Sequence, residues 1–397
     1  MNLRILAVYE GDFFARHELG FVASLATSHE VTVLDLESNA ERIEIRKILI
    51  KSDDVASTTL VKIPASYLRG RNFVNKIKPL IGSYDIIITS ARKALLLSRR
   101  LSRDDPLILR LWSIRANKVI DNLAHGVYKD IVIFMPSLIA NTYYINIADI
   151  IITEENATYT LARRISKITS RKPVVRIYPP YGTIIDDLNS RDIHNDSMNS
   201  LLDLIERFRD TYILGTTILR KRGEYARFEA LPHTMIYYLT AKKNPGIPFF
   251  ILGSTKMDFI QRLGIARDKV PSNMFFLNDY LKYLPDWLIE KAYIGARIII
   301  NYISNRSISN RLIEALYYGK PIITNKMAQV LHPELKHGTH VHIVHSEDYY
   351  PNAVKEMYED DQYLNELSKN AKLIYRSMFS STANLRIFNH IITYIIT

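Results

Sequence analysis

Short apolar runs recur along the chain and alternate with segments whose apolar residues have helical spacing. Leu3–Tyr9 is an apolar run, Leu19–Ala26 an amphipathic segment and Val31–Leu36 a second apolar run. This order predicts strand, helix and strand, the beginning of an open parallel sheet. Further strands are expected at 84–89, 107–111, 147–153 and 173–177, and helices at 91–101 and 153–167. Residues 41–60 are ambiguous, and we expect a helix followed by a loop there.

The pattern stops at Pro179–Gly182 and restarts after a polar stretch. Strands are then expected at 212–216, 248–253, 273–277, 298–303, 322–324 and 342–345, and helices at 228–242, 256–263, 283–294, 350–358, 363–378 and 388–396. We therefore predict an α/β fold of two Rossmann-like domains, as two copies of one architecture. The first domain is expected over 1–185, a linker over 186–204, the second domain over 205–379, and a last helix over 380–397.

One stretch of the second half, IIINYISNRSISNRLIEALYYGKPIIT from Ile298, predicts strand, loop, helix, turn and strand. Ser307 or Ser309 can cap a helix that begins near Asn310, and Gly319 can end that helix in the left-handed conformation. A strand that leads into a helix N-terminus makes an anion site at the carboxyl edge of the sheet. Glu314, in the second turn, is near enough to reach a ligand's hydroxyl groups, although taken alone it is better explained as a solvated helix residue.

The composition of the 397 residues is that of a globular protein, with 47% apolar and 23% charged residues. Cysteine is absent, which excludes disulfides and thiol chemistry. Because no apolar run is long enough to span a bilayer and no signal peptide is evident, we expect a cytoplasmic protein. Abundant Ile, Tyr and Arg without Cys hint at a thermophilic source.

The formal net charge of +11 is unevenly distributed. Residues 62–129 contain 14 Lys and Arg but only 4 Asp and Glu. Such an excess predicts an acidic partner, and its interleaved apolar residues favour an anionic membrane surface. A solvated surface with thermophile-type charge is the alternative, and no nucleic-acid-binding motif is present.

Several segments together resemble retaining glycosyltransferases of the GT-B fold, in particular family 4, the group 1 enzymes of the glycogen-synthase-like superfamily. The segments that carry the resemblance are GTTILRKRGEYARFEAL, GIPFFILGS, RSISNRLIEALYYGKPIIT and HGTHVHIV in the second half, and YDIIITSARKALLLSRRL and ADIIITEENATYTLARRI in the first. The resemblance implies that the two domains face each other across a cleft and that the last helix, over 380–397, crosses back to the first domain. It further implies transfer of a sugar from a nucleotide-diphosphate sugar to an acceptor, with retention of configuration. It also implies that the donor, a UDP- or GDP-sugar, is used without a metal ion or other cofactor.

The resemblance assigns roles to residues of both halves. Glu314 would hold the ribose, the turn at Ser309, Asn310 and Arg311 would hold the diphosphate with Gly215 nearby, and the basic residues Arg220, Lys221 and Arg222 would neutralise the departing diphosphate, with Arg222 the main candidate. In the first half, Gly11, Arg16, His17 and Arg115 are expected at the acceptor side. His17 could contact acceptor or phosphate, or be an ordinary residue of a first helical turn.

One position departs from the family. The family has two glutamates with seven residues between them, and Glu314 fits the second, but the first falls on Arg306. Arg306 could pair with the donor phosphate or with an acidic sugar, or have no role. A binding or scaffold protein of the same fold that has lost its chemistry is therefore the alternative function.

Two other readings are weaker. Five histidines, His332, His337, His340, His342 and His345, lie within fourteen residues, but few carboxylates and no Cys accompany them, so a solvated loop and strand is favoured over a metal site. A nicotinamide-dependent enzyme would need G-x-G-x-x-G after a strand, and the chain has none.

The acceptor is expected to be a lipid-linked glycan, a glycoprotein or a polysaccharide, as the resemblance implies.

Overall fold

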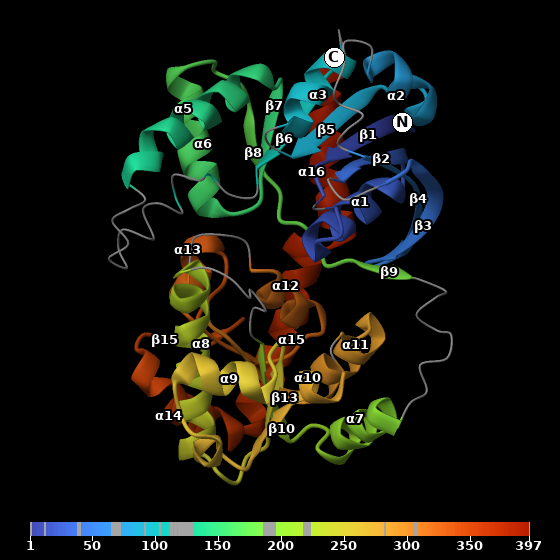
Figure 1. Ribbon diagram of the computed structural model, residues 1–397. Coiled ribbons are helices and arrows are strands. Elements are labelled where there is room, and N and C mark those ends of the chain that lie inside the picture. The colour runs from blue at the N-terminus through green and yellow to red at the C-terminus, as the bar shows by residue number, and fades with distance from the viewer. Residues whose placement is uncertain are drawn as a thin grey trace. The chain divides into compact units, whose positions relative to one another are not determined.

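The computed structural model describes residues 2–396 except 12, 38–40, 65–72, 91–92, 103–104, 112–113, 115–116, 118–130, 186–195, 217–223, 282 and 305–308, with backbone alone at 93, 131, 133, 224–230 and 396. The chain divides into two compact units (Figure 1). The first unit is Met1–Asp186, Arg306–Asn310 and Arg376–Thr397, and the second is Asp187–Asn305 and Arg311–Tyr375.

The first unit is built on a nine-stranded sheet in the order β8-β7-β6-β5-β1-β2-β4-β3-β9. Its strands are β1 (Arg4–Tyr9), β2 (Glu30–Glu37), β3 (Glu44–Lys51), β4 (Val55–Pro64), β5 (Ile86–Ser90), β6 (Leu107–Leu111), β7 (Ile150–Thr153), β8 (Val174–Arg176) and β9 (Thr183–Ile185). All neighbouring pairs are parallel except those of β3, which is antiparallel to both β4 and β9.

Helices cover both faces of this sheet. They are α1 (Arg16–Ala26), α2 (Phe73–Ile81), α3 (Lys93–Leu101), α5 (Ile131–Ile147), α6 (Asn156–Ile168) and α16 (Ser381–Ile396). Helices α1 and α16 pack with Ile5 and Ala7 on one face, through Phe21 and Phe388, whose rings meet at 6.3 Å. Helices α2, α3, α5 and α6 pack with Leu6 and Val8 on the other face. We call these four helices the basic layer, for the charges described below.

The second unit is built on a six-stranded, entirely parallel sheet in the order β12-β11-β10-β13-β14-β15. Its strands are β10 (Tyr212–Thr216), β11 (Phe249–Leu252), β12 (Met274–Phe276), β13 (Ala296–Asn301), β14 (Ile322–Asn325) and β15 (His342–Val344). Its longer helices are α7 (Asp196–Arg207), α8 (Glu224–Lys243), α9 (Lys256–Leu263), α11 (Asp286–Gly295), α12 (Asn310–Tyr317), α14 (Tyr350–Tyr358) and α15 (Asp361–Ile374). Short helical turns complete it: α10 (Leu277–Tyr280), α13 (Met327–Leu331), η4 (Arg267–Lys269) and η5 (Glu347–Tyr349). A π-turn, η6 (Tyr375–Phe379), follows α15 where the chain passes from the second unit to the first.

The predicted fold class is confirmed. Each of the two units is an α/β unit built on a wholly or mostly parallel sheet, and the last helix, α16, belongs to the first unit. The last helix, α16, runs over Ser381–Ile396 and so begins seven residues before the helical pattern over 388–396. Of the expected linker 186–204, residues 196–204 lie in α7, whose buried face includes Leu201 and Leu204. The expectation of two copies of one architecture was wrong in detail, because the sheets differ in strand number and only the first contains an antiparallel strand.

Residues 41–60 were wrongly expected to be helix and loop, because they form β3 and most of β4. The two strands pair antiparallel from Glu44 with Lys62 to Lys51 with Val55, across a turn in which the Ser52 amide donates to the Asp54 carbonyl. Burial alternates along part of each strand, as over 55–58 in β4, which is the period of a half-buried strand. The α5 helix and the edge strand β9 were not predicted at all.

Candidate functional site

The helix α12 begins at Asn310 and follows β13 across the undescribed residues 305–308. Leu312, Ala315 and Leu316 are fully buried and fix one face of α12 against the sheet. The predicted end of this helix is confirmed, since Gly319 adopts a positive φ of 62° that glycine tolerates best. The strand–helix–strand order thereby brings the first turns of α12 to the carboxyl edge of the six-stranded sheet.

Glu314 lies in the second turn of α12 and is only 8% exposed. The Tyr293 hydroxyl, on α11, donates a hydrogen bond of 2.7 Å to Glu314 Oε2. This contact orients the carboxyl group and compensates for part of its desolvation. Glu314 is therefore not a solvent-exposed helix residue, which was the alternative, and the hydrogen bond holds its side chain in a defined position.

The end of β10 is fixed by side chains from two helices. The Thr216 carbonyl accepts a hydrogen bond of 2.7 Å from the Tyr237 hydroxyl of α8 and one of 2.8 Å from Arg311 Nη1 of α12. Burial raises the pKa of Tyr237 to about 12, so its hydroxyl keeps the proton it donates. Arg311, expected to bind the donor, thus has one guanidinium nitrogen committed to the edge of the sheet.

The segment after β13 is held by the side chain of Asn325 at the end of β14. Asn325 Nδ2 donates to the Ile303 carbonyl at 2.8 Å, and the Ile303 amide donates to Asn325 Oδ1 at 3.3 Å. A side-chain amide that pairs with both backbone groups of one residue acts like a neighbouring strand. It fixes the chain immediately before the undescribed residues 305–308.

Gly215, expected beside the donor, lies within β10 against aromatic side chains. A Cβ atom at this position would lie 2.9 Å from Phe249 Cε1 and 3.2 Å from two atoms of the Tyr237 ring. Dense packing by these rings is therefore sufficient to explain glycine here.

A hollow of about 220 Å³ lies alongside β12, the outermost strand of this sheet, and the first residue of α9. Its lining consists of Lys256, Met274, Phe275, Phe276, Asp279 and Tyr280. The Lys256 amide at the start of α9 donates to Asp279 Oδ1 at 3.0 Å, which fixes one wall of the hollow. Aromatic and charged groups thus line this hollow, as they do in many ligand pockets.

In the first unit, three expected acceptor-side residues lie at the end of β1 and the start of α1. Gly11 has a φ of 77°, and its amide donates a 2.8 Å hydrogen bond to Oδ1 of the buried Asp35. Arg16 begins α1 and donates from Nη1 to the Tyr181 hydroxyl at 3.2 Å.

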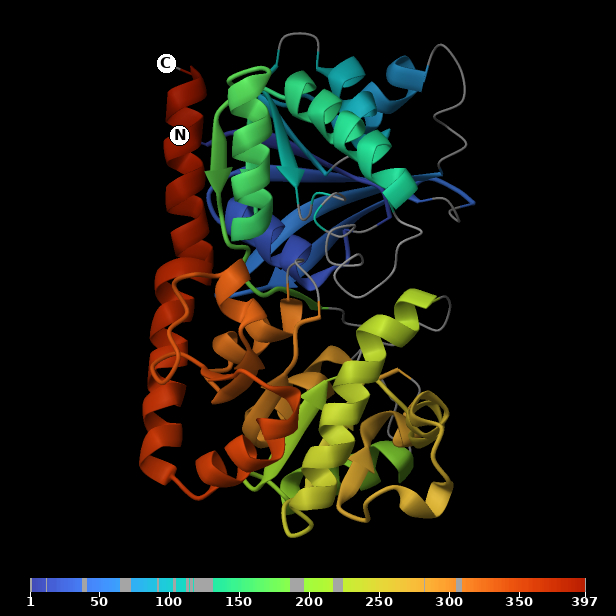
Figure 2. The same cartoon turned by 90° about the vertical axis from the view of Figure 1, so that its left-hand side faces the viewer.

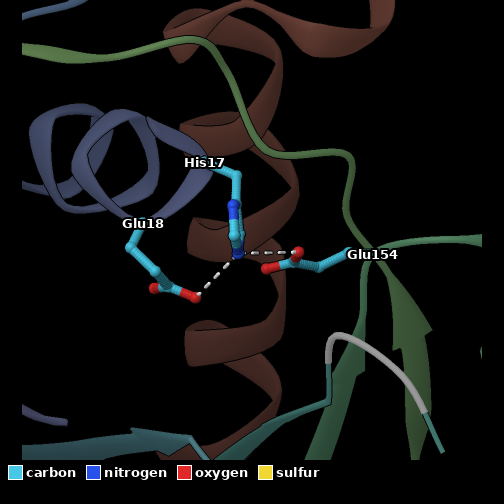
Figure 3. A group of neighbouring side chains, drawn as sticks. All are labelled: His17, Glu18 and Glu154. Atoms are coloured by element: carbon cyan, nitrogen blue, oxygen red, sulfur yellow. Dashed lines mark ion pairs between the residues drawn. The ribbon is translucent and has the colours of Figure 1, made fainter. Parts of the chain in front are cut away.

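His17 is buried in a cluster of ionisable side chains, together with Glu18, Arg110 and Glu154. Arg110 extends from β6, and its two terminal nitrogens donate to Glu18 Oε2 and Glu154 Oε1. The guanidinium carbon also lies 3.8 Å from the centre of the Phe21 ring. The other oxygens of the two carboxyl groups face His17 Nε2, at 3.6 Å for Glu18 and 3.9 Å for Glu154 (Figure 3).

The electrostatics of this cluster follow from its burial. Burial, and next the positive charge of Arg110, lower the pKa of His17 to about 3, so the imidazole is neutral at pH 7. Within the described part of the chain, His17, Glu18 and Glu154 form the one group of three side chains that could hold a metal ion, with ligand atoms within 4.8 Å of one another. Arg110 already supplies positive charge to both carboxyl groups, so we interpret the cluster as an ion-pair network.

The histidine-rich segment forms structural contacts rather than one convergent group. His337 Nδ1 accepts the Ile343 amide at 2.9 Å, and His340 Nδ1 accepts the Lys336 amide at 3.1 Å. His342 Nδ1 lies 3.1 Å from the Tyr363 hydroxyl. These nitrogens stabilise the turn before β15 and its packing on α15.

Five expected site residues, Arg115, Arg220, Lys221, Arg222 and Arg306, lie outside the described residues. Their assignments stay predictions, as does a cap by Ser307. Ser309 and Asn310 lie at the start of α12, where the prediction placed them, but nothing in the structure tests whether they bind phosphate.

The sequence analysis missed Glu18, Arg110 and Glu154 as a group. A signal was present, because Arg110 is the only charged residue of the apolar run LILRL, and a charge inside a buried strand needs a buried partner. We had instead counted Arg110 among the surface charges of residues 62–129, which was wrong, since it is 2% exposed.

No family model matches this sequence, and no curated protein matches it by sequence comparison. Solved structures do resemble it over nearly the whole of both chains. HepE of Anabaena, in complex with UDP and glucose, has a TM-score of 0.61 at 15% identity and covers 98% of this chain and 99% of its own. Sucrose-phosphate synthase of Thermosynechococcus elongatus has a TM-score of 0.64 at 14% identity, covering 99% of each chain.

A trehalose-phosphate synthase (UDP-forming) of Burkholderia vietnamiensis has a TM-score of 0.61 at 8% identity and covers 98% of this chain and 96% of its own. The HepE structure contains UDP and glucose, and the other two proteins are named as synthases of a disaccharide phosphate. At such low identity the likeness concerns the fold. The chain therefore has the fold of the GT-B glycosyltransferases.

Proposed function

We propose that the protein is a glycosyltransferase that moves a sugar from a nucleotide-diphosphate sugar to an acceptor with retention of configuration. The observation that carries the proposal is the position of Glu314, buried in the second turn of α12 at the carboxyl edge of the six-stranded sheet. A carboxylate held there can accept hydrogen bonds from both ribose hydroxyls of a nucleotide. The glycosyltransferase fold of the chain supports the same reading.

In this proposal the donor lies against the second unit. The amides at the start of α12, including Ser309 and Asn310, bind the diphosphate, and Arg220, Lys221 and Arg222 neutralise it. The bond between the anomeric carbon and the diphosphate oxygen breaks while the acceptor oxygen bonds to that carbon on the same face. The departing phosphate oxygen takes the acceptor proton, so no protein base and no metal ion is required.

The donor nucleotide is proposed to be UDP or GDP. The hollow beside β12 offers aromatic side chains for a base, together with Lys256 and Asp279. On the first unit, Gly11, Arg16, His17 and Arg115 are proposed for the acceptor side. The acceptor class that we propose, a lipid-linked glycan, places the protein on an anionic membrane surface through residues 62–129. No described helix is long and apolar enough to cross a membrane.

A binding or scaffold protein without chemistry is the second candidate. It is favoured by Arg306, which stands where the family has a glutamate, and by the hydrogen bond that already engages Glu314 Oε2 with Tyr293. Such a protein would bind nucleotide sugar and not turn it over.

Thermal-shift measurements with UDP-, GDP- and ADP-sugars, followed by donor hydrolysis assays, test the proposal. Sugars of one nucleotide class should raise the melting temperature of the wild type. At a ligand concentration of one hundred times Kd, binding stabilises the folded protein by about 2.7 kcal/mol. The variant Glu314→Gln should lose most of this shift, and Glu366→Gln, an exposed glutamate of α15, should keep it. Stabilisation without hydrolysis or transfer would support the scaffold reading, and no stabilisation by any donor would contradict both.

A further inference from the structure

The outer face of α5 carries a continuous row of exposed apolar side chains. Val132 is 79% exposed, Met135 58%, Ile139 64% and Tyr143 54%. Their spacing of three, four and four residues puts them on one side of the helix. The opposite side of α5 is occupied, because Phe134, Leu138 and Tyr144 pack against the core of the first unit. The row is therefore an outward face of a helix that is already anchored from within.

The composition of α5 is unlike that of a solvated surface helix. None of the 17 residues of Ile131–Ile147 is charged. A surface helix normally places polar and charged side chains on the face that its core contacts leave exposed. A run of large apolar side chains exposed on one face indicates an interaction surface.

The helices around α5 carry positive charge without any negative charge. The basic layer, α2, α3, α5 and α6, contains eight Lys and Arg residues and no Asp or Glu. Helix α6 packs directly beside α5 (Figure 2) and exposes Arg163, Arg164 and Lys167. Further exposed cations are Lys76 and Lys78 on α2 and Arg99 and Arg100 on α3.

Two more large apolar side chains of the same layer are exposed. Ile168, at the end of α6, is 84% exposed, and Leu96 on α3 is 43% exposed. Apolar and cationic side chains are thus interleaved over several helices that cover one face of one sheet.

We propose that the basic layer is a docking surface for an anionic lipid bilayer, with the α5 row inserted among the lipids at the interface. The proposal deepens the membrane association that the proposed function includes, and it moves the contact from residues 62–129 alone to a surface centred on α5. Apolar side chains that enter the acyl boundary and cations that remain among anionic headgroups are the two components of interfacial binding. A layer without any acidic residue matches the headgroup charge, which selects a lipid surface over a second copy of this basic chain.

Sedimentation with vesicles of phosphatidylglycerol and phosphatidylcholine tests this docking. The wild-type chain should bind vesicles rich in phosphatidylglycerol, and bind them less at high salt. The pair Met135→Gln/Ile139→Gln should lower the partition coefficient by at least about tenfold, because each change removes apolar groups that enter the bilayer. The pair Arg163→Gln/Arg164→Gln should lower it at low salt and weaken its salt dependence.

A matched control is available in the second unit. Met257 on α9 and Leu373 on α15 are 56% and 52% exposed, close to the values of Met135 and Ile139. The pair Met257→Gln/Leu373→Gln should bind vesicles as the wild type does. Equal binding of both apolar variants and the wild type, or no binding of the wild type to anionic vesicles, would overturn the proposal.

Two further measurements distinguish the lipid surface from a second copy of this chain, and the docking surface from the proposed transferase activity. Sedimentation velocity without vesicles would reveal a dimer that Met135→Gln/Ile139→Gln dissociates, and that result would replace the bilayer by a second copy. Hydrolysis of a soluble nucleotide sugar, measured in parallel, should be the same for the α5 variants and the wild type. Absent hydrolysis with intact vesicle binding would count against the transferase and leave the docking surface in place.

Discussion

Tyr293 donates its hydroxyl hydrogen to Glu314 at 2.7 Å, and both side chains are buried in the second unit. The pair joins α11 to α12. It means that a carboxyl group proposed to bind a nucleotide ribose is also part of the structure that holds its helix. The two roles of Glu314 can be separated by changing either partner.

We expect Tyr293→Phe to lower the free energy of unfolding by about 1.5–3 kcal/mol, the range for a hydrogen bond to a charged group. Its nucleotide-sugar binding should fall much less than that of Glu314→Gln, which keeps an oxygen for Tyr293 but loses the charge that strengthens hydrogen bonds from the ribose. Urea unfolding measures the free energy of unfolding, and isothermal titration with UDP- and GDP-sugars measures binding. If both variants lost binding equally, Glu314 would act only by positioning α12.

The Arg110 network makes a prediction about stability in the first unit. Arg110→Met leaves the carboxyl groups of Glu18 and Glu154 buried without their shared cation, which should cost about 3–5 kcal/mol. The exposed pair Arg209 and Glu206 offers a control, and Arg209→Met should cost less than about 1 kcal/mol.

The chain's two tryptophans allow this unfolding to be assigned to a unit. Trp112 belongs to the first unit and Trp287 to the second, so Trp287→Phe leaves one fluorescent reporter for the first. In the Trp287→Phe background, Arg110→Met should lower the urea concentration at the midpoint of unfolding, and Arg209→Met should leave it unchanged. An unchanged midpoint in Arg110→Met would mean that the two carboxyl groups need no cation.

The sequence predicted the parts of the fold that depend on local pattern. The strands over 107–111 and 212–216 and the helices over 256–263 and 350–358 have the predicted bounds. Each combines a strong period with a clear stop, such as Gly264 after α9, which adopts a φ of 62°. The antiparallel pair β3 and β4 was missed, because its alternation is interrupted by polar residues and its burial depends on neighbours far along the chain.

The candidate site was predicted in outline and missed in its contacts. Glu314 and Gly319 were found because both belong to one continuous strand–helix–strand pattern. Tyr293 and Tyr237 were not found, because a tyrosine on a helix looks the same in sequence whether its hydroxyl meets water or the end of a strand. Partners brought together only by the tertiary fold leave no local signal.

Two glycines of the first unit lie where the neighbouring backbone leaves no room for a side chain. A Cβ on Gly20, in α1, would lie 2.0 Å from the Pro180 carbonyl oxygen, and one on Gly182 would lie 2.2 Å from the Gly20 nitrogen. The backbones thus touch where the prediction placed only a break at Pro179–Gly182. Because neither neighbour is a flexible side chain, Gly20→Ala should cost at least about 3 kcal/mol by overpacking.

A matched glycine serves as control for this prediction. Gly246 has open space where a Cβ would be placed and no positive φ, so Gly246→Ala should change the free energy of unfolding by less than about 1 kcal/mol. Urea unfolding of the three proteins compares them directly. A Gly20→Ala variant as stable as Gly246→Ala would show that α1 and the segment at Pro180 can separate without loss.

The last prediction concerns acid sensitivity of the second unit. His233, on α8, is 4% exposed, and its ring lies 5.2 Å from that of Tyr302. Burial, followed by the charges of Arg311 and Arg262, lowers the pKa of His233 from 6.5 to about 3. Between these pH values the unfolded chain binds a proton at His233 that the folded chain does not. Stability therefore falls as the pH falls, by about 1.4 kcal/mol per pH unit from this residue.

His233→Phe keeps an aromatic ring and removes the titrating group. Its free energy of unfolding should depend less steeply on pH between about 6 and 4 than that of the wild type, while the two dependences should run parallel above pH 7. Urea unfolding at several pH values, with Trp112→Phe so that Trp287 reports on the second unit, measures both slopes. If the wild type and His233→Phe lost stability equally on acidification, the pKa of His233 would be the same in the folded and the unfolded protein, and this prediction would be wrong.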